Sequence, residues 1–165
     1  DGKQIWEIDR FKKGISNMFL NGKDLIVCSG KALYNVDYKT GKEKYEVSLE
    51  VDDISLAEKI ISPESLGENV NKDNVIIIGS KGVSAHNMKT GAKVWANRTK
   101  SGDFNGIYGT TAFYQTESDD QFAIDVNTGK ATFYNARKNA KAEYSSDGNY
   151  LYAFEKKVVT KLSTK

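Results

Sequence analysis

Three stretches of the chain align without a gap on a Thr-Gly pair: LYNVDYKTGKEKY at residues 33–45, VSAHNMKTGAKVW at residues 83–95 and FAIDVNTGKATF at residues 122–133. In each stretch an Asp or Asn lies four residues before the glycine, and an aromatic residue lies four residues after it. The three sets are Asp37, Gly41 and Tyr45, then Asn87, Gly91 and Trp95, then Asp125, Gly129 and Phe133. A pattern that recurs in register in this way indicates an internal repeat.

The two ends of the chain carry the two halves of the same unit. Residues 1–6 read DGKQIW and place Trp6 four residues after Gly2. Residues 158–165 read VVTKLSTK. Joined end to start, the two halves place Ser163 four residues before Gly2, so that they complete one unit without an insertion or a deletion.

The spacing of the repeat indicates the fold. The turn glycines recur every 38 to 39 residues, apart from one interval of 50 residues. A period near 40 is typical of one four-stranded propeller blade. Runs rich in β-branched and aromatic residues predict a further strand before each unit, at residues 25–29, 74–78, 111–115 and 150–154. We therefore predict an all-β fold, a β-propeller of about four four-stranded blades, in a single domain over residues 1–165.

The long interval contains an insertion at residues 51–72. Within it, residues 55–61 are predicted to form a helical turn, which Pro63 limits because proline is not tolerated inside a helix.

The repeated residues have structural roles that follow from their chemistry. An Asp or Asn side chain at the start of a turn accepts hydrogen bonds from backbone N–H groups, and glycine supplies the positive φ. An aromatic residue on the outer strand covers apolar area between neighbouring sheets, because one blade cannot bury its face alone. We therefore predict a blade-docking role, and no catalytic role, for the residues of the repeat: Trp6, Tyr45, Trp95, Phe133, Asp37, Asn87, Asp125, Gly2, Gly41, Gly91 and Gly129.

These units resemble the pyrroloquinoline-quinone-like (PQQ-like) β-propeller repeat, whose blades carry Ala-x-Asp-x-x-Thr-Gly-Lys-x-x-Trp. Trp6 and Trp95 keep the tryptophan of that pattern, whereas Tyr45 and Phe133 replace it conservatively. The resemblance covers essentially the whole chain. It implies that the aromatic residues dock one blade on the next.

The resemblance implies two branches of function. Quinone-dependent dehydrogenases have similar blades but also carry adjacent cysteines and calcium ligands, whereas this chain has one cysteine, Cys28. The other branch resembles the outer-membrane assembly lipoprotein, a non-catalytic propeller that binds protein partners. It implies a non-enzymatic protein-binding or scaffold module, periplasmic or extracellular, with no cofactor. The alternatives are a quinone-dependent dehydrogenase-like enzyme or a fragment of one, and a small-ligand sensor domain.

The two half-repeats at the ends of the chain are compatible with three arrangements of the blades. The chain could close on itself as a four-bladed ring, or two copies could exchange strands in a homodimer that forms an eight-bladed ring. It could also be a piece of a longer propeller, since relatives more often have about seven or eight blades. The chain opens on Asp1 rather than Met, so we expect a processed protein or a trimmed chain.

Composition narrows the classes of function further. Its 24 basic and 22 acidic residues leave a net charge of +2, which is not the basic footprint of nucleic-acid binders. No apolar run approaches the ~20 residues that a membrane helix needs. One cysteine and one histidine cannot build a Cys/His zinc cage. We therefore predict no nucleic-acid binding, no membrane span and no metal site, and we expect Cys28 and His86 to lie on buried strand positions.

The remaining candidate site lies in the insertion, where five carboxylates gather: Asp52, Asp53, Glu58, Glu64 and Glu68. They lack the alternating Asp/Asn-and-Gly loop of calcium sites. We predict instead that they contact a partner protein, because the loops of repeat folds carry their specificity. Deleting the insertion is then expected to leave the fold intact and to abolish partner capture.

Overall fold

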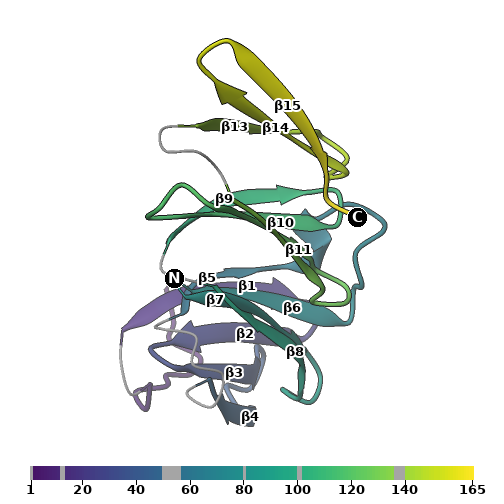
Figure 1. The fold of residues 1–165 in the computed structure, drawn as a ribbon. Coiled ribbons are helices and arrows are strands. Elements are labelled where there is room, and N and C mark those ends of the chain that lie inside the picture. Colours follow the sequence, from purple (N-terminus) through teal and green to yellow (C-terminus); the bar gives the residue numbers. More distant parts are fainter. Residues whose placement is uncertain (1, 12–13, 50–56, 80, 100–101, 136–139) are drawn as a thin grey trace.

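The fold is an all-β propeller of four antiparallel sheets, as the repeat predicts (Figure 1). The structure is a computed structural model and describes residues 2–11, 14–49, 57–79, 81–99, 102–135 and 140–165. We number the sheets along the chain as blades 1 to 4.

Each blade is an up-and-down meander in which consecutive strands pair. Blade 1 consists of β1 (Ile15–Asn21), β2 (Asp24–Ser29), β3 (Ala32–Asp37) and β4 (Glu43–Ser48). Blade 2 consists of β5 (Ala57–Ile61), β6 (Asn74–Gly79), β7 (Gly82–Asn87) and β8 (Lys93–Arg98), with a 3-10 helix η2 (Pro63–Ser65) between β5 and β6. Blade 3 consists of β9 (Gly102–Tyr108), β10 (Thr111–Thr116), β11 (Gln121–Asp125) and β12 (Ala131–Tyr134). Blade 4 consists, in the described residues, of β13 (Lys141–Tyr144), β14 (Tyr150–Glu155) and β15 (Val158–Ser163).

The hydrophobic core lies between the blades. Strand β6 reads NVIIIG, and all six of its residues are buried. Val75 and Ile77 belong to the apolar cluster shared with blade 1, whereas Ile76 and Ile78 belong to the cluster shared with blade 3. Because successive side chains of a strand point to opposite faces, a continuous apolar run marks a strand that is covered on both sides.

Residues 57–61 form strand β5, so the predicted helical turn is wrong there. The strand pairs with β6, and Ile60, opposite Ile77, is buried between blades 1 and 2. This pairing outweighs a local helical preference, as tertiary contacts commonly do. The range 51–72 contains β5 and the buried Val70, so it forms part of blade 2 and we expect its deletion to disturb that blade.

The blades follow one another in a row, with blade 1 and blade 4 at opposite ends (Figure 1). Residues 2–11 pack on the outer face of blade 1, where the Phe11 and Tyr34 rings meet edge-on with centroids 5.0 Å apart. Blades 1 to 3 each have an outer fourth strand, whereas in the described residues no strand pairs with the outer edge of β15. In the described residues the blades therefore form an open row (Figure 1).

Candidate interaction surface

The Asp-x-x-Thr-Gly turns have one geometry in blades 1, 2 and 3. The Asp37 Oδ1 atom accepts hydrogen bonds from Lys39 N at 3.0 Å, Thr40 N at 2.9 Å and Thr40 Oγ1 at 3.0 Å. Asn87 and Asp125 accept the equivalent three bonds at 2.9 to 3.2 Å. These bonds hold the pKa of Asp37 below its ordinary value, because they stabilise the charged carboxylate. The side chain at this position is therefore engaged in holding the turn.

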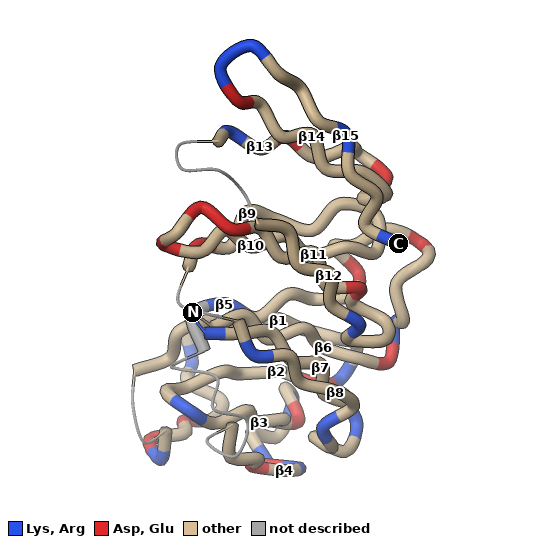
Figure 2. Tube along the Cα trace, viewed as in Figure 1, with Lys and Arg blue, Asp and Glu red and all other residues tan. Residues whose placement is uncertain are grey.

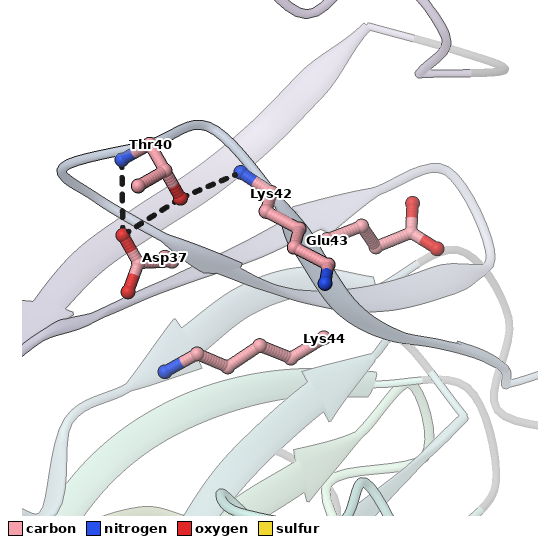
Figure 3. A pocket seen from close by; sticks show the side chains of 5 residues that line it. All are labelled: Asp37, Thr40, Lys42, Glu43 and Lys44. Carbon is pink, nitrogen blue, oxygen red and sulfur yellow. Dashed lines mark hydrogen bonds between the residues drawn. The ribbon is translucent and has the colours of Figure 1, made fainter.

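A hollow of about 440 Å³ lies beside the first of these turns and is lined by Asp37, Thr40, Lys42, Glu43 and Lys44 (Figure 3). Three of its charged side chains, Asp37, Glu43 and Lys44, already have protein partners. Glu43 forms an ion pair with Arg10 at 3.4 Å, and Lys44 forms one with Asp24. Thr40 holds Asp37 within the turn, so the hollow is the underside of a structural turn. The side chains that line it do not point to a common centre as catalytic groups would (Figure 3).

Aromatic residues of one outer strand rest on the turn glycine of the next blade. A Cβ added at Gly129 would lie 2.6 Å from the Trp95 ring, and one added at Gly91 would lie 2.9 Å from the Tyr45 ring. Trp6 lies against Gly41 in the same way, at 3.0 Å. All three of these glycines have φ between 69° and 74°, a region in which residues with a Cβ are strained.

The polar tips of two of these aromatics bind equivalent carbonyls. Trp6 Nε1 donates to Tyr38 O at 2.9 Å, and Tyr45 Oη donates to Met88 O at 3.0 Å. Each acceptor lies three residues before the turn glycine. The contact between neighbouring blades thus combines ring stacking with a directed hydrogen bond.

Phe133 lies differently from the other aromatics of the repeat. Strands β4 and β8 each contain a register shift before their aromatic residue, whereas β12 pairs with β11 without one. A one-residue difference in register turns a side chain to the other face of the sheet. Phe133 therefore packs against Phe122 of its own blade in a tilted geometry, with ring centroids 4.8 Å apart, and is 43% exposed.

Blade 3 contacts blade 4 through the two neighbours of Phe133 instead. Thr132 Oγ1 donates to Thr164 O at 3.4 Å, and the Tyr134 hydroxyl donates to Ser163 O. Gly2 also differs from the other turn glycines, because a Cβ built there would meet no atom within 4 Å.

The loop between β5 and β6, residues 62–73, is fastened at two points. Lys72 Nζ donates to three carbonyls of the loop, Pro63 O at 2.6 Å, Leu66 O at 3.0 Å and Gly67 O at 3.3 Å. From blade 3, Asn127 accepts from Asn71 N and donates to Asn69 O, both at 2.8 Å. Sequence reasoning missed both fasteners. The Asn127 contacts join segments more than fifty residues apart, and the Lys72 contacts depend on the folded conformation of the loop.

A second hollow, of about 370 Å³, lies next to this loop and joins three blades. It is lined by Asn69, Gly109, Thr110, Asn127, Asp147, Asn149 and Lys165. Asp147 accepts from Ser145 Oγ at 2.5 Å, Asn149 N at 3.0 Å and Asn149 Nδ2 at 2.7 Å, which lowers its pKa to about 2. We call this side of the molecule the turn face and define it by loop 62–73, turn 125–130 and turn 145–149.

The five carboxylates of the insertion do not all fall within the described structure. Asp52 and Asp53 lie outside the described residues, and the same holds for the side chain of Glu58, whose backbone belongs to β5. Glu64 and Glu68 are exposed on loop 62–73. The structure therefore places two of the five on the turn face.

Cys28 and His86 are both buried, as the sequence predicts. Burial raises the pKa of the Cys28 thiol, and His86 Nδ1 lies 3.1 Å from Gly91 O in the blade 2 turn. A buried thiol of raised pKa is a poor nucleophile. Across the described ranges, no three His, Cys, Asp or Glu side chains gather as metal ligands would.

The charges of the described residues are mixed over the surface. Figure 2 shows Lys and Arg on all four blades, with Asp and Glu interspersed among them. None of the described helices is long and apolar enough to cross a membrane.

The chain is similar to known proteins in its sequence family and in its fold. A family model described as outer membrane protein assembly factor BamB matches residues 1–106 of the 165. No curated protein matches the chain. The family match covers the first two repeats and the start of blade 3.

Several solved structures share the fold. The computationally designed Ika4 protein aligns over 100% of both chains, with a TM-score of 0.60 and 9% identity. The WD40 domain of Pan2 from Neurospora crassa has a TM-score of 0.55 and 15% identity, over 86% of this chain and 43% of that one. The dihydro-heme d1 dehydrogenase NirN, in complex with DHE, has a TM-score of 0.56 and 12% identity, over 86% of this chain and 33% of that one. This chain thus spans less than half of the length of Pan2 and NirN that was compared, and at these identities the likeness shows the fold alone.

The contact between Trp95 and Gly129 predicts that a methyl group added at Gly129 strongly destabilises the fold. We expect Gly129→Ala to lower the free energy of unfolding by about 2 to 4 kcal/mol, because the new Cβ is strained at positive φ and also overlaps the indole. Gly22→Ala is the matched control, since Gly22 has φ of 61° but no atom within 4 Å of an added Cβ. It should cost only the backbone strain of about 1 kcal/mol. Urea unfolding of the two variants measures the difference, and equal losses would contradict blade docking at this glycine.

Asp147 predicts a pH dependence of stability. Its pKa is about 2 in the folded protein and 3.8 as an ordinary value, so its carboxylate stabilises the fold above about pH 4. That contribution is lost as the pH falls from 4 towards 2. We expect Asp147→Asn to be less stable than the parent protein at pH 7 and to approach it at pH 2.5. A stability gap that stays constant over this range in urea unfolding would contradict the assignment.

Proposed function

The chain belongs to the family of the outer membrane protein assembly factor BamB, and we propose that it is a non-enzymatic protein-binding or scaffold module of the cell envelope or the extracellular space. The match to the family model and the propeller fold support a protein-interaction module in general. The envelope location and the scaffold role rest on the family to which the chain belongs. The proposed partner is an envelope protein.

We choose this surface because loop 62–73 is already held in one conformation in the free chain. Lys72 gathers three carbonyls of the loop, and Asn127 ties it to the neighbouring blade. A loop that is already ordered loses less conformational entropy on binding, which favours affinity. Such a fastening is what a recognition surface requires.

The chemistry of the loop indicates the kind of partner surface. Glu64 and Glu68 are exposed on the loop, and the adjacent hollow is lined mainly by amide and hydroxyl side chains. Carboxylates and amides of this kind suit a partner with basic and polar groups, since charge complementarity steers association and fixes orientation. The Asp147 carboxylate is engaged by its own turn, so it contributes to the shape of the face.

Site-specific photocrosslinking tests this proposal. We expect a benzophenone amino acid at position 64 or 68 to crosslink to the same protein in an envelope fraction. The control position is Lys81, which is exposed at the opposite end of β6, and it should give no such product. The charge reversal Glu64→Lys with Glu68→Lys should reduce the yield at least tenfold, because it reverses the charge of the loop.

Two different results would contradict the proposal. Crosslinking at Lys81 equal to that at Glu64 would show that the turn face is not the binding surface. No product at any of these positions, in a chain whose circular dichroism is unchanged, would count against a protein-binding role.

A further inference from the structure

The chain contains two Asn-Gly pairs, Asn21-Gly22 and Asn105-Gly106. In such a pair the backbone nitrogen of the glycine can attack the side-chain amide carbon of the asparagine, because glycine has no Cβ to block the approach and adopts many backbone conformations. The structure places the two pairs in different surroundings. The same dipeptide is therefore expected to react at two different rates in the folded protein.

The first pair lies at the tip of the β1–β2 hairpin. Asn21 is the last residue of β1, and Gly22 is the first residue of the turn. Gly22 is exposed, and a Cβ added there would meet no atom within 4 Å. Asn21 Nδ2 donates to Met88 Sδ at 3.5 Å, and a thioether sulfur is a weak acceptor. Because a hairpin tip opens locally more readily than the interior of a sheet, the amide of this pair can reach the glycine nitrogen.

The second pair lies inside β9 and is held by blade 4. Gly106 pairs with Phe113 of β10. Asn105 Nδ2 donates to the Tyr144 hydroxyl at 2.8 Å, and that hydroxyl donates to the buried Gln121 Oε1, also at 2.8 Å. Successive hydrogen bonds of this kind strengthen one another and fix the orientation of the amide. The fold therefore protects this second pair.

We propose that Asn21 is a site of spontaneous deamidation in the folded protein. The Gly22 nitrogen loses its proton and attacks Asn21 Cγ, a C–N bond forms, and the side-chain nitrogen leaves as ammonia. The product is a five-membered succinimide. Water then opens the ring at one or the other of its carbonyl carbons, which gives aspartate or isoaspartate at this position. One water is consumed and one ammonia is released, with no oxidant or reductant.

The reaction changes the contact between blades 1 and 2, which centres on Met88. Met88 is buried in the apolar cluster shared by these blades. Its backbone oxygen accepts from Asn35 Nδ2 and from Tyr45 Oη, both at 3.0 Å, and its sulfur accepts from Asn21. A carboxylate has no proton to donate, so deamidation removes the last of these three contacts.

The new carboxylate also meets another carboxylate across the hairpin. Asn21 lies directly opposite Asp24, whose side chain pairs with Lys44. Like charges at opposite positions of two antiparallel strands destabilise the pairing. The isoaspartate form adds a further carbon atom to the backbone of the hairpin. We therefore expect both products to loosen the β1–β2 hairpin and its contact with blade 2.

Peptide mapping by mass spectrometry tests the proposal. The purified folded chain is kept in mildly alkaline buffer, and the aspartate and isoaspartate forms of each site are followed over time. We expect Asn21 to convert at least tenfold faster than Asn105, because only the second site is held by the fold. The control is the chain unfolded in guanidinium chloride, in which the two sites should convert at similar rates. Equal rates in the folded chain would overturn the proposal, as would an unchanged Asn21 while the unfolded chain reacts.

Ion exchange then separates the deamidated chain, which carries one more negative charge, from the unmodified chain. We expect the deamidated fraction to unfold at a lower urea concentration than the unmodified fraction from the same incubation. Equal midpoints would overturn the inferred effect on the contact between blades 1 and 2.

Two variants test the structural reason for the difference between the sites. Gly22→Ala should slow the conversion of Asn21 at least tenfold, because the added Cβ hinders the attack. Tyr144→Phe should speed the conversion of Asn105 severalfold and leave Asn21 unchanged, since the ring still packs on Phe113 but the hydroxyl that holds the amide is lost. A Gly22→Ala chain that converts as fast as the parent would overturn the proposal. A Tyr144→Phe chain in which Asn105 stays as slow as before would overturn the protection assigned to blade 4.

Discussion

The contact between an outer-strand aromatic and the turn glycine of the next blade constrains the rest of this structure. The glycine must satisfy two requirements at once, since it needs a positive φ to close its own turn and a bare Cα to let the ring approach. Gly129 shows both, with φ of 73° and the Trp95 ring where a Cβ would be. Turn geometry and blade packing are therefore fixed by the same residue. This coupling explains why Gly and the aromatic recur at one spacing along the chain.

The contact has a direction, which makes the two ends of the row unlike. The outer strands of blades 1 and 2 reach forward to the turn glycine of the following blade, and the outer strand of blade 3 reaches blade 4 through Thr132 and Tyr134. At the start of the row, Trp6 reaches blade 1 from a segment without an accompanying blade. At the end, Phe154 and Val159 remain exposed where a following blade would cover them.

The sequence predicted what depends on the repeat and missed what depends on local departures from it. The all-β propeller and the hairpins at β2, β6, β10 and β14 followed from spacing and strand-forming composition. The face on which Phe133 lies did not, because Gly129 and Phe133 have the usual spacing and only the missing register shift in β12 turns the ring over. The sequence predicts a helical turn where strand β5 forms, because the partner strand β6 lies beyond an intervening loop. For the candidate site, the sequence found Glu64 and Glu68 but not Lys72 and Asn127, whose hydrogen bonds depend on the folded chain.

The directional contact also links assembly to the proposed binding surface. In each of blades 1 to 3 the Thr-Gly turn joins the third strand to the outer strand, so these turns lie on one side of the molecule. Rotation about a propeller axis keeps that side common to all blades. Loop 62–73 and the turn at residues 125–130 belong to that same side, where Asn127 joins them. A partner that binds the loop would therefore also meet the turns of the neighbouring blades, so that several modest contacts would add to one stable interaction.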